Sequence, residues 1–529
     1  MGTLFIGRRL RGVALIGAVA LLVASASPRA ASDPALLMEA IRRGDVATVR
    51  LLLRDRASLN VNAADADGTT PLHAAVHVDN VAIVTALLRA GANPKAANRY
   101  GLQPITLAAT NGSAAAIGAL LEAGADANTA TTAGEPVLMT ASRTGNVEAV
   151  RVLLRAGAQV NAREPSFGET ALMWASAENH AATVQALLDA GAEADARSTV
   201  LDAPTLEFPR SGGPNSPFPR GGWTALMFAA RDGALDAARV LAGAGATLNL
   251  VALPQTDFPL KGADASSADR GVGTTALVFA IINSHYDLAA MLLEQGADPN
   301  VADLSGEAAL YAAVDMNSLQ WVQGRPAPIL RDTLDAVDLV TLLLKKGANP
   351  NAKLGRTPLK RHHDAGSVLG FNQGATPLMR AARTNDVAVM KALIDGGADP
   401  FARLPDQTTV LMLAAGLGYG GLRGEGIRIV VPTPEGAVEA MQLLLGHGLD
   451  VDAFNTAGQT ALHAAVARGD AVVRFLAERG ATLDFKNKAG FTPLDLAMGQ
   501  GGRGGRPGVP RESTAALLRR LMQERPGRQ

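Results

Sequence analysis

Hydrophobic and polar positions repeat along this chain with a long period. A glycine that follows a leucine-rich stretch recurs at two different spacings. The early copies lie about 33 residues apart, at Gly91, Gly124, Gly157 and Gly191. The later copies lie roughly 50 residues apart, with one shorter last step, at Gly245, Gly296, Gly347, Gly397, Gly448 and Gly480. Self-similarity with a period of about 20–50 residues is the sequence signature of a repeat architecture.

A second landmark explains the two spacings. A helix-start segment occurs as TPLHAA at 70–75, TALMWA at 170–175, TALMFA at 224–229, TALVFA at 275–280, TPLMRA at 376–381 and TALHAA at 460–465. The stretch from the start of this segment to the following glycine is nearly constant in most units, but it is almost twice as long in the units that begin at Ala308 and Thr409. The period is therefore about 33 residues throughout, interrupted by insertions both within and between units.

Each unit predicts two helices and a turn. A threonine can cap the first helix, and Leu72, Ala75 and Val76 follow at the i, i+3, i+4 spacing of one buried helix face. The second helix carries leucine pairs such as Leu87-Leu88, and the glycine then ends it in the left-handed conformation. Asn and Asp residues follow where a turn is required.

These residues resemble the ankyrin-repeat family in the TPLHxA start, the LLxxGAD helix end and the period of about 33 residues. The resemblance extends from residue 34 to the C-terminus in about eleven units. It implies an all-α solenoid of stacked helix-turn-helix units. Gln103, Pro136 and Ala308 depart from the pattern because they replace the capping threonine, at a loss of about 1 kcal/mol each.

The same landmarks predict the domain organisation. We expect a signal peptide at 1–26, an N-terminal capping helical unit at 34–60, ankyrin repeats at 61–498, and an interrupted last repeat with a C-terminal capping helix at 499–529. Long insertions lie near 197–221, 250–272, 316–334, 353–372 and 417–434. In the family that the chain resembles, insertions between units lengthen the loops beside the concave face, and insertions within units lengthen the opposite edge.

The first residues favour export. Arg8, Arg9 and Arg11 precede an apolar run from Gly12 to Val23, and the small residues Ala24-Ser25-Ala26 suit a signal peptidase. The run is shorter than the roughly 20 residues that span a bilayer. We therefore expect cleavage, a periplasmic or secreted protein and no stable membrane insertion afterwards. An uncleaved membrane anchor is the alternative.

Composition and motifs favour binding over catalysis. The chain has no cysteine, which excludes disulfides and thiolate chemistry, and its 49 basic residues match 49 acidic ones, which argues against a nucleic-acid partner. Walker, HExxH and GxSxG motifs are absent, and the GxGxxG match at 416–421 follows a helical pattern instead of a strand. We expect no catalytic, cofactor or metal site. His362, His363 and Asp364, in the insertion 353–372, are the alternative, although neighbouring loop residues converge poorly on one ion.

One position of the first helix suggests where a protein partner binds. A side chain two residues after the buried leucine lies about 200° around the helix, away from the core. That position holds Trp174, Phe228 and Phe279 in successive units, and Arg380 in a later unit. One hypothesis is that these residues contact a partner on the concave face. In the alternative, Phe208, Phe218 and Phe258 of the inserted loops fold back and make the aromatic residues a local core.

The sequence as a whole predicts an exported, non-enzymatic protein–protein interaction scaffold. Its partner, of unknown identity, would bind the concave face and the extended loops between units. Two other functions stay open: an enzyme or ligand-sensing protein with a site in the insertions, and a translocated effector that acts inside another cell.

Overall fold

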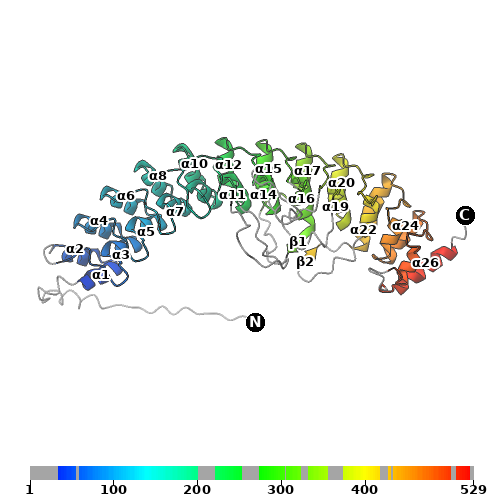
Figure 1. Cartoon of the computed structure of the whole chain (residues 1–529), viewed down its shortest axis with the longest axis horizontal. Coiled ribbons are helices and arrows are strands. Elements are labelled where there is room, and N and C mark those ends of the chain that lie inside the picture. The colour runs from blue at the N-terminus through cyan, green and yellow to red at the C-terminus, as the bar shows by residue number, and fades with distance from the viewer. Residues whose placement is uncertain are drawn as a thin grey trace, which may run out of the picture. The chain divides into compact units, whose positions relative to one another are not determined.

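The chain forms two compact units, Met1–Pro165 and Ser166–Gln529, built from pairs of short helices (Figure 1). The structure is a computed structural model, and it describes residues 34–54, 59–200, 221–252, 273–303, 305–322, 332–355, 373–417, 427–429, 433–501 and 508–524. The expected signal peptide and most of the inserted residues lie outside these ranges.

In the first unit, the helices form two rows. The first row comprises α1 (Pro34–Arg42), α3 (Pro71–His77), α5 (Pro104–Thr110) and α7 (Val137–Thr144). The second row comprises α2 (Val46–Leu52), α4 (Val81–Arg89), α6 (Ala114–Glu122) and α8 (Val147–Arg155). Each helix packs on its partner in the same repeat and on its neighbours in the same row.

The second unit has the same arrangement. Its first row comprises α9 (Ala171–Ala177), α11 (Ala225–Asp232), α14 (Ala276–Ile282), α16 (Ala309–Ser318), α19 (Pro377–Thr384), α21 (Val410–Ala414), α23 (Ala461–Ala465) and α25 (Pro493–Ala497). Its second row comprises α10 (Ala181–Asp189), α12 (Leu235–Gly243), α15 (Tyr286–Glu294), α17 (Ala336–Lys345), α20 (Val387–Asp395), α22 (Pro434–Gly446), α24 (Asp470–Glu478) and α26 (Glu512–Glu524). The expected all-α solenoid is confirmed.

The helix ends follow from the residues that the sequence places there. Thr224 caps α11, since its side-chain oxygen accepts a hydrogen bond from the backbone N–H of Met227. Gln103 and Pro136 make no such side-chain bond within the described chain, as expected from the missing threonine. Gly91 follows α4 with φ of 92°, in the left-handed region that favours glycine.

The core of each repeat lies between its two helices. In α11, Leu226, Ala229 and Ala230 are buried at the expected i, i+3, i+4 spacing. Ala238 and Leu241 of α12 are fully buried against them. Small alanines allow the short helices of successive repeats to approach one another closely.

An asparagine in the turn of one repeat binds the glycine that ends the second helix of the next. The side-chain amide of Asn62 donates to the carbonyl of Gly91, 29 residues later, with an N···O distance of 3.1 Å. The amide of Asn300 makes the same bond to the carbonyl of Gly347, 47 residues later, at 2.9 Å. The contact between repeats is thus the same whether or not an insertion separates its two residues.

Two inserted segments form the one two-stranded sheet among the described residues. Strand β1 (Leu319–Val322) directly follows α16, and it pairs antiparallel with β2 (Ile427–Ile429), which precedes α22. Both segments contain the residue types Ile, Val or Trp that favour strands. An all-α prediction missed this ribbon because its two strands are far apart in the sequence.

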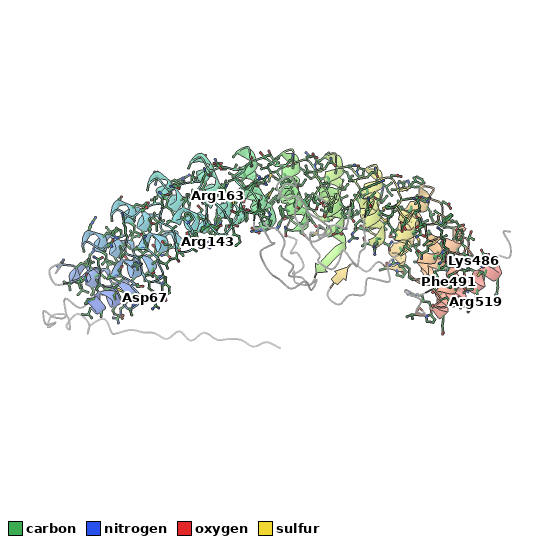
Figure 2. The ribbon with its side chains drawn as sticks, in the orientation of Figure 1. Asp67, Arg143, Arg163, Lys486, Phe491 and Arg519 are labelled. Atoms are coloured by element: carbon green, nitrogen blue, oxygen red, sulfur yellow. The ribbon has the colours of Figure 1, made fainter. Side chains whose placement is uncertain are left out.

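The C-terminal helix α26 packs on α24 and α25 and buries Leu517 and Leu518. Its Arg519 donates a hydrogen bond to the sulfur of Met498 at 3.1 Å, near the end of the chain (Figure 2). Within the ranges given above, no helix combines the length and apolar character needed to cross a membrane.

Candidate partner-binding face and buried arginine

The structure places the four candidate partner-binding residues in two different environments. Trp174 of α9 is partly exposed. Phe228 of α11, Phe279 of α14 and Arg380 of α19 are only 6%, 7% and 1% exposed. Neighbouring first helices and the residues before them therefore cover this helix position in three of the four units, and burial is the alternative that the sequence left open for the aromatic residues.

Trp223, which sequence reasoning missed, packs on two of the buried rings. Its ring centroid lies 5.4 Å from that of Phe228 and 5.0 Å from that of Phe279, with interplanar angles of 67° and 61°. The guanidinium of Arg231 lies 5.3 Å from the Trp223 centroid. Such edge-on pairs stabilise a core beyond the area that they bury. The sequence signal that could have revealed this packing is a tryptophan directly before the capping Thr224.

These contacts favour a local core at Phe228 and Phe279. In one hypothesis from the sequence, three loop phenylalanines cover this core. These residues lie outside the described part of the chain: Phe208, Phe218 and Phe258. Trp223 provides part of that cover instead.

Trp174 differs because its ring remains partly in contact with solvent. The indole Nε1 donates a hydrogen bond to Oε2 of Glu169 at 2.7 Å, which fixes the ring on α9. A fixed, partly exposed tryptophan offers a large contact surface at a small loss of conformational entropy on binding.

Other exposed aromatic side chains lie in the loops between repeats. More than half of the surface of each is exposed: Tyr100 in the first unit, and Phe167, Phe401 and Phe454 in the second. Phe167 precedes Gly168 at a loop turn that leads into α9, the helix of Trp174. No local pattern in the sequence distinguishes these four residues.

Arg380 is the largest fully buried side chain in the described chain. Its Nε donates to Oδ1 of Asp315 in α16 at 2.6 Å. Its other two nitrogens, Nη1 and Nη2, are buried and have no hydrogen-bond partner among the atoms of the described chain. Buried polar groups almost always have a partner, so these two atoms require an explanation.

The surroundings of Arg380 contain a second cation and a buried phenol. Burial, followed by the positive charge of Arg380, lowers the pKa of Arg383 to about 10. Burial also raises the pKa of Tyr311, a residue of α16 that interacts electrostatically with both arginines, Asp315 and Glu307. Arg383 lies one helical turn after Arg380 on α19, so two guanidinium groups lie close together in a poorly hydrated place.

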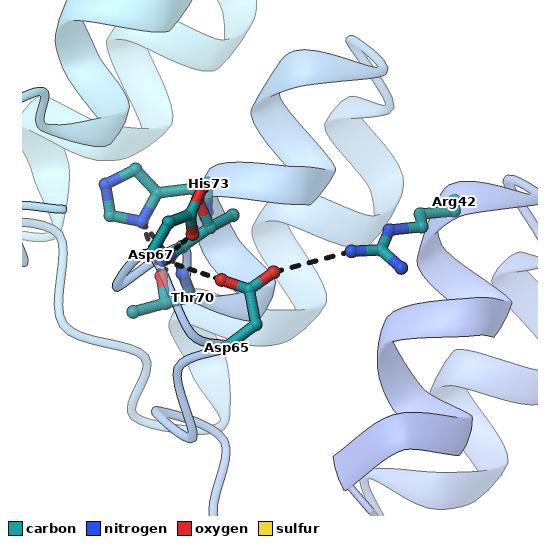
Figure 3. A network of polar contacts seen from close by, with 6 residues as sticks. Arg42, Asp65, Asp67, Thr70 and His73 are labelled. Carbon is teal, nitrogen blue, oxygen red and sulfur yellow. Dashed lines mark hydrogen bonds and ion pairs between the residues drawn. The ribbon is translucent and has the colours of Figure 1, made fainter. Parts of the chain in front are cut away.

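The TPLHxA histidines make structural hydrogen bonds within and between repeats. In α3, Nδ1 of His73 accepts from the backbone N–H of Thr70 at 3.2 Å (Figure 3). Nε2 of His73 lies 2.9 Å from the carbonyl oxygen of Leu102. Asp65, in the loop before α3, pairs with Arg42 at 3.4 Å (Figure 3). His463 repeats the arrangement with Thr460 and the carbonyl of Phe491. Both histidines therefore hold one repeat to the next.

The remaining candidates for chemistry are outside the described residues or lack a supporting geometry. His362, His363 and Asp364 fall outside the described ranges. The described residues contain no group of three His, Cys, Asp or Glu side chains arranged to hold a metal ion. Gly416 follows helix α21, so the start of the GxGxxG match does not follow a strand.

Comparison with known families gives consistent matches. A family model of three ankyrin repeats matches residues 13–98, 37–131, 105–198 and 429–504. A single ankyrin-repeat model matches residues 272–304 and 373–403. The matches extend into both compact units.

Similar curated proteins also match over part of the chain. The human Transient receptor potential cation channel subfamily A member 1 is 25% identical over 296 residues, which covers 43% of this chain and 26% of that protein. The human SH3 and multiple ankyrin repeat domains protein 2 is 28% identical, over 31% of this chain and 11% of that protein. The human Neurogenic locus notch homolog protein 1 is 36% identical, over 24% of this chain and 4% of that protein. The matched regions thus span about a quarter or less of these relatives.

Proposed function

Because the chain belongs to the ankyrin-repeat family, whose repeats form protein–protein interaction domains, we propose that it is an exported, non-enzymatic scaffold. Its partner is a protein, and it binds the first-row helices and the loops between repeats. The proposal concerns this chain alone, since the relatives are matched over small parts of their length.

The distribution of aromatic side chains carries the proposal. Phe228 and Phe279 are buried in the helices, whereas Trp174 is partly exposed and Phe167 is more than half exposed. Exposed aromatic residues in loops on a rigid scaffold are typical of protein-binding surfaces. We therefore centre the binding surface on Trp174 and Phe167, and not on the buried rings.

Affinity purification with matched variants tests the proposal. The full chain, purified from its native envelope, is compared with Trp174→Ala and Phe167→Ala, and captured proteins are identified by mass spectrometry. A contact residue at the centre of an interface contributes about 2 kcal/mol or more to the free energy of binding. Each variant should therefore capture much less of a specific partner than the wild type does. Leu51→Ala, an exposed apolar residue of the second helix row, is the control and should retain it. Retention by all three variants contradicts the proposed surface.

Export rests on the arginine-rich start and the Ala24-Ser25-Ala26 sequence. Intact-mass analysis of the envelope protein should give a chain that begins at Ser27 or within a few residues of it. A full-length product confined to the cytosol contradicts export.

Ligand sensing is the second candidate function, and one observation favours it. Arg380 is buried with two nitrogens that no described protein atom satisfies.

A further inference from the structure

The hydrogen-bond deficit at Arg380 involves two of its three nitrogens. A guanidinium carries five N–H donors, and only the one on Nε is used, by Asp315. One turn away, the side chain of Asn385 is fully engaged: its amide donates to the carbonyls of Ala382 and Ala414, and its oxygen accepts from Arg468. The packing around α19 thus satisfies another buried polar group but leaves four N–H groups of Arg380 without an acceptor among the described residues.

The unused donors have a defined geometry. Nη1 and Nη2 lie in one plane and present parallel N–H groups that match the two oxygens of a carboxylate. We propose that Arg380 anchors a binding site for a small carboxylate ligand, with Arg383 and Tyr311 beside it. The site does not depend on the proposed scaffold function, because it uses none of the exposed aromatic residues.

The local charge favours a monoanion. Arg380 and Arg383 contribute two positive charges, and Asp315 and Glu307 contribute two negative ones. A dianionic phosphate would add two uncompensated charges to a poorly hydrated cluster, whereas a carboxylate adds one. A carboxylate also supplies two acceptors in the plane of the guanidinium.

Burial favours a small ligand over a side chain of a protein partner. Arg380 is 1% exposed, so an acidic side chain on a docked protein has no direct access to it.

The repeats around Arg380 also differ from the other described repeats, because they carry the two strands. Helix α19 packs between α16 and α21, and the repeats of these two helices supply β1 and β2 (Figure 1). Pairing of the two strands therefore bridges the repeats on either side of Arg380.

Thermal unfolding of the full chain tests the site. Acetate, propionate and phosphate are titrated against chloride at equal ionic strength. Acetate or propionate should raise the unfolding temperature in a saturable way, because a ligand that binds the folded state stabilises it. In Arg380→Lys the apparent affinity should fall about tenfold or more, since lysine lacks the planar fork. Arg239→Lys, an exposed arginine on α12, is the matched control and should bind as the wild type does.

Several results would overturn the proposal. They are no saturable response to either carboxylate, an equal response in Arg380→Lys, or a stronger response to phosphate. An acidic decapeptide of glutamate serves as a further arm. Binding of this peptide through Arg380, without any response to acetate or propionate, overturns the assignment to a small ligand.

A second pair of variants keeps the test decisive if Arg380→Lys does not fold. Asp315→Asn removes the competing negative charge and leaves Arg380 in place. Calorimetric titration with propionate should then give an affinity several-fold higher than that of the wild type. Asp236→Asn, which alters the exposed pair with Arg239, should leave the affinity unchanged. An unchanged or weaker affinity in Asp315→Asn contradicts a carboxylate site at Arg380.

Discussion

Helices α3 and α19 begin in the same way but use their buried polar side chains differently. Each follows a threonine cap and starts with a proline. In α3, both ring nitrogens of His73 have partners, one within the repeat and one in the next. In α19, only one of the three nitrogens of Arg380 has a partner among the described residues. The first arrangement stabilises the packing of one repeat on the next. The second leaves the N–H groups of Nη1 and Nη2 of Arg380 to bind the proposed carboxylate.

The largest expected effect concerns the buried aromatic residues that lie between these two helices in sequence. Phe228→Ala and Phe279→Ala should each lower the free energy of unfolding by about 3–5 kcal/mol, because each removes a buried ring that packs on Trp223. Trp174→Ala should have a much smaller effect, since that ring is partly exposed. Chemical unfolding of the three variants measures the difference. Equal losses of unfolding free energy in all three variants would contradict the assignment of Phe228 and Phe279 to the core and of Trp174 to the surface.

The next effect sharpens the comparison at α19. The double variant Arg380→Met and Asp315→Asn should leave the ligand-free stability unchanged or raise it by about 1–4 kcal/mol, since a buried ion pair contributes little net stability. The same variant should lose its response to propionate. Denaturant unfolding with and without propionate provides both readouts. A stability loss of several kcal/mol would assign Arg380 a structural role like that of His73.

At α3 the opposite result is expected, and it depends on pH. His73→Leu leaves the N–H of Thr70 and the carbonyl of Leu102 without side-chain partners, which should lower stability by about 1–3 kcal/mol. Burial lowers the pKa of His73 and of His463 below the ordinary value of 6.5. The unfolded chain therefore takes up protons first as pH falls.

The stabilisation from these two histidines is thus fully present above pH 6.5 and declines as pH falls below 6.5 through the folded-state values. Urea unfolding at about pH 7.5 and about pH 5 should show this loss in the wild type. The variant His73→Leu with His463→Leu should show a shallower pH dependence. An unchanged dependence of stability on pH in this variant would mean that other titratable groups determine that dependence.

The smallest effect concerns a helix that lacks the usual start. In α5, Gln103 makes no capping bond in the described structure, and the hydroxyl of Thr106 is buried without a partner there. Gln103→Thr should therefore raise the free energy of unfolding by about 1 kcal/mol. Thr224→Ala in α11 is the reverse control and should lower it by a similar amount. If Gln103→Thr does not raise the free energy of unfolding, the missing cap is not what limits the stability of α5.

These comparisons also show which features could be predicted from the sequence. Threonine caps, glycine helix ends and the buried leucine stripe are local, so the pattern predicted the helices of α3 and α19 alike. The packing of Trp223 on Phe279 and the burial of Arg380 depend on contacts between different repeats. A helix position that faces away from its own repeat can still be covered by a neighbouring one.

The strand pair was unpredictable for the same reason. Leu319 pairs with Ile429 across a distance in sequence that no local pattern reports. Four exposed loop aromatics were also missed, because their loop positions vary from one repeat to another. The sequence thus predicted the repeating scaffold well, and it predicted poorly the side chains that distinguish one repeat from the next.

Site-specific photo-crosslinking tests the central claim, that the first-row helices and loops bind a protein, most directly. A photoreactive benzoylphenylalanine replaces Trp174 in one chain and the exposed Leu51 of the second row in another, and both are irradiated in the native envelope. The account predicts a discrete crosslinked protein from position 174 and none from position 51. Crosslinks of the same proteins from both positions, or only from position 51, would contradict it.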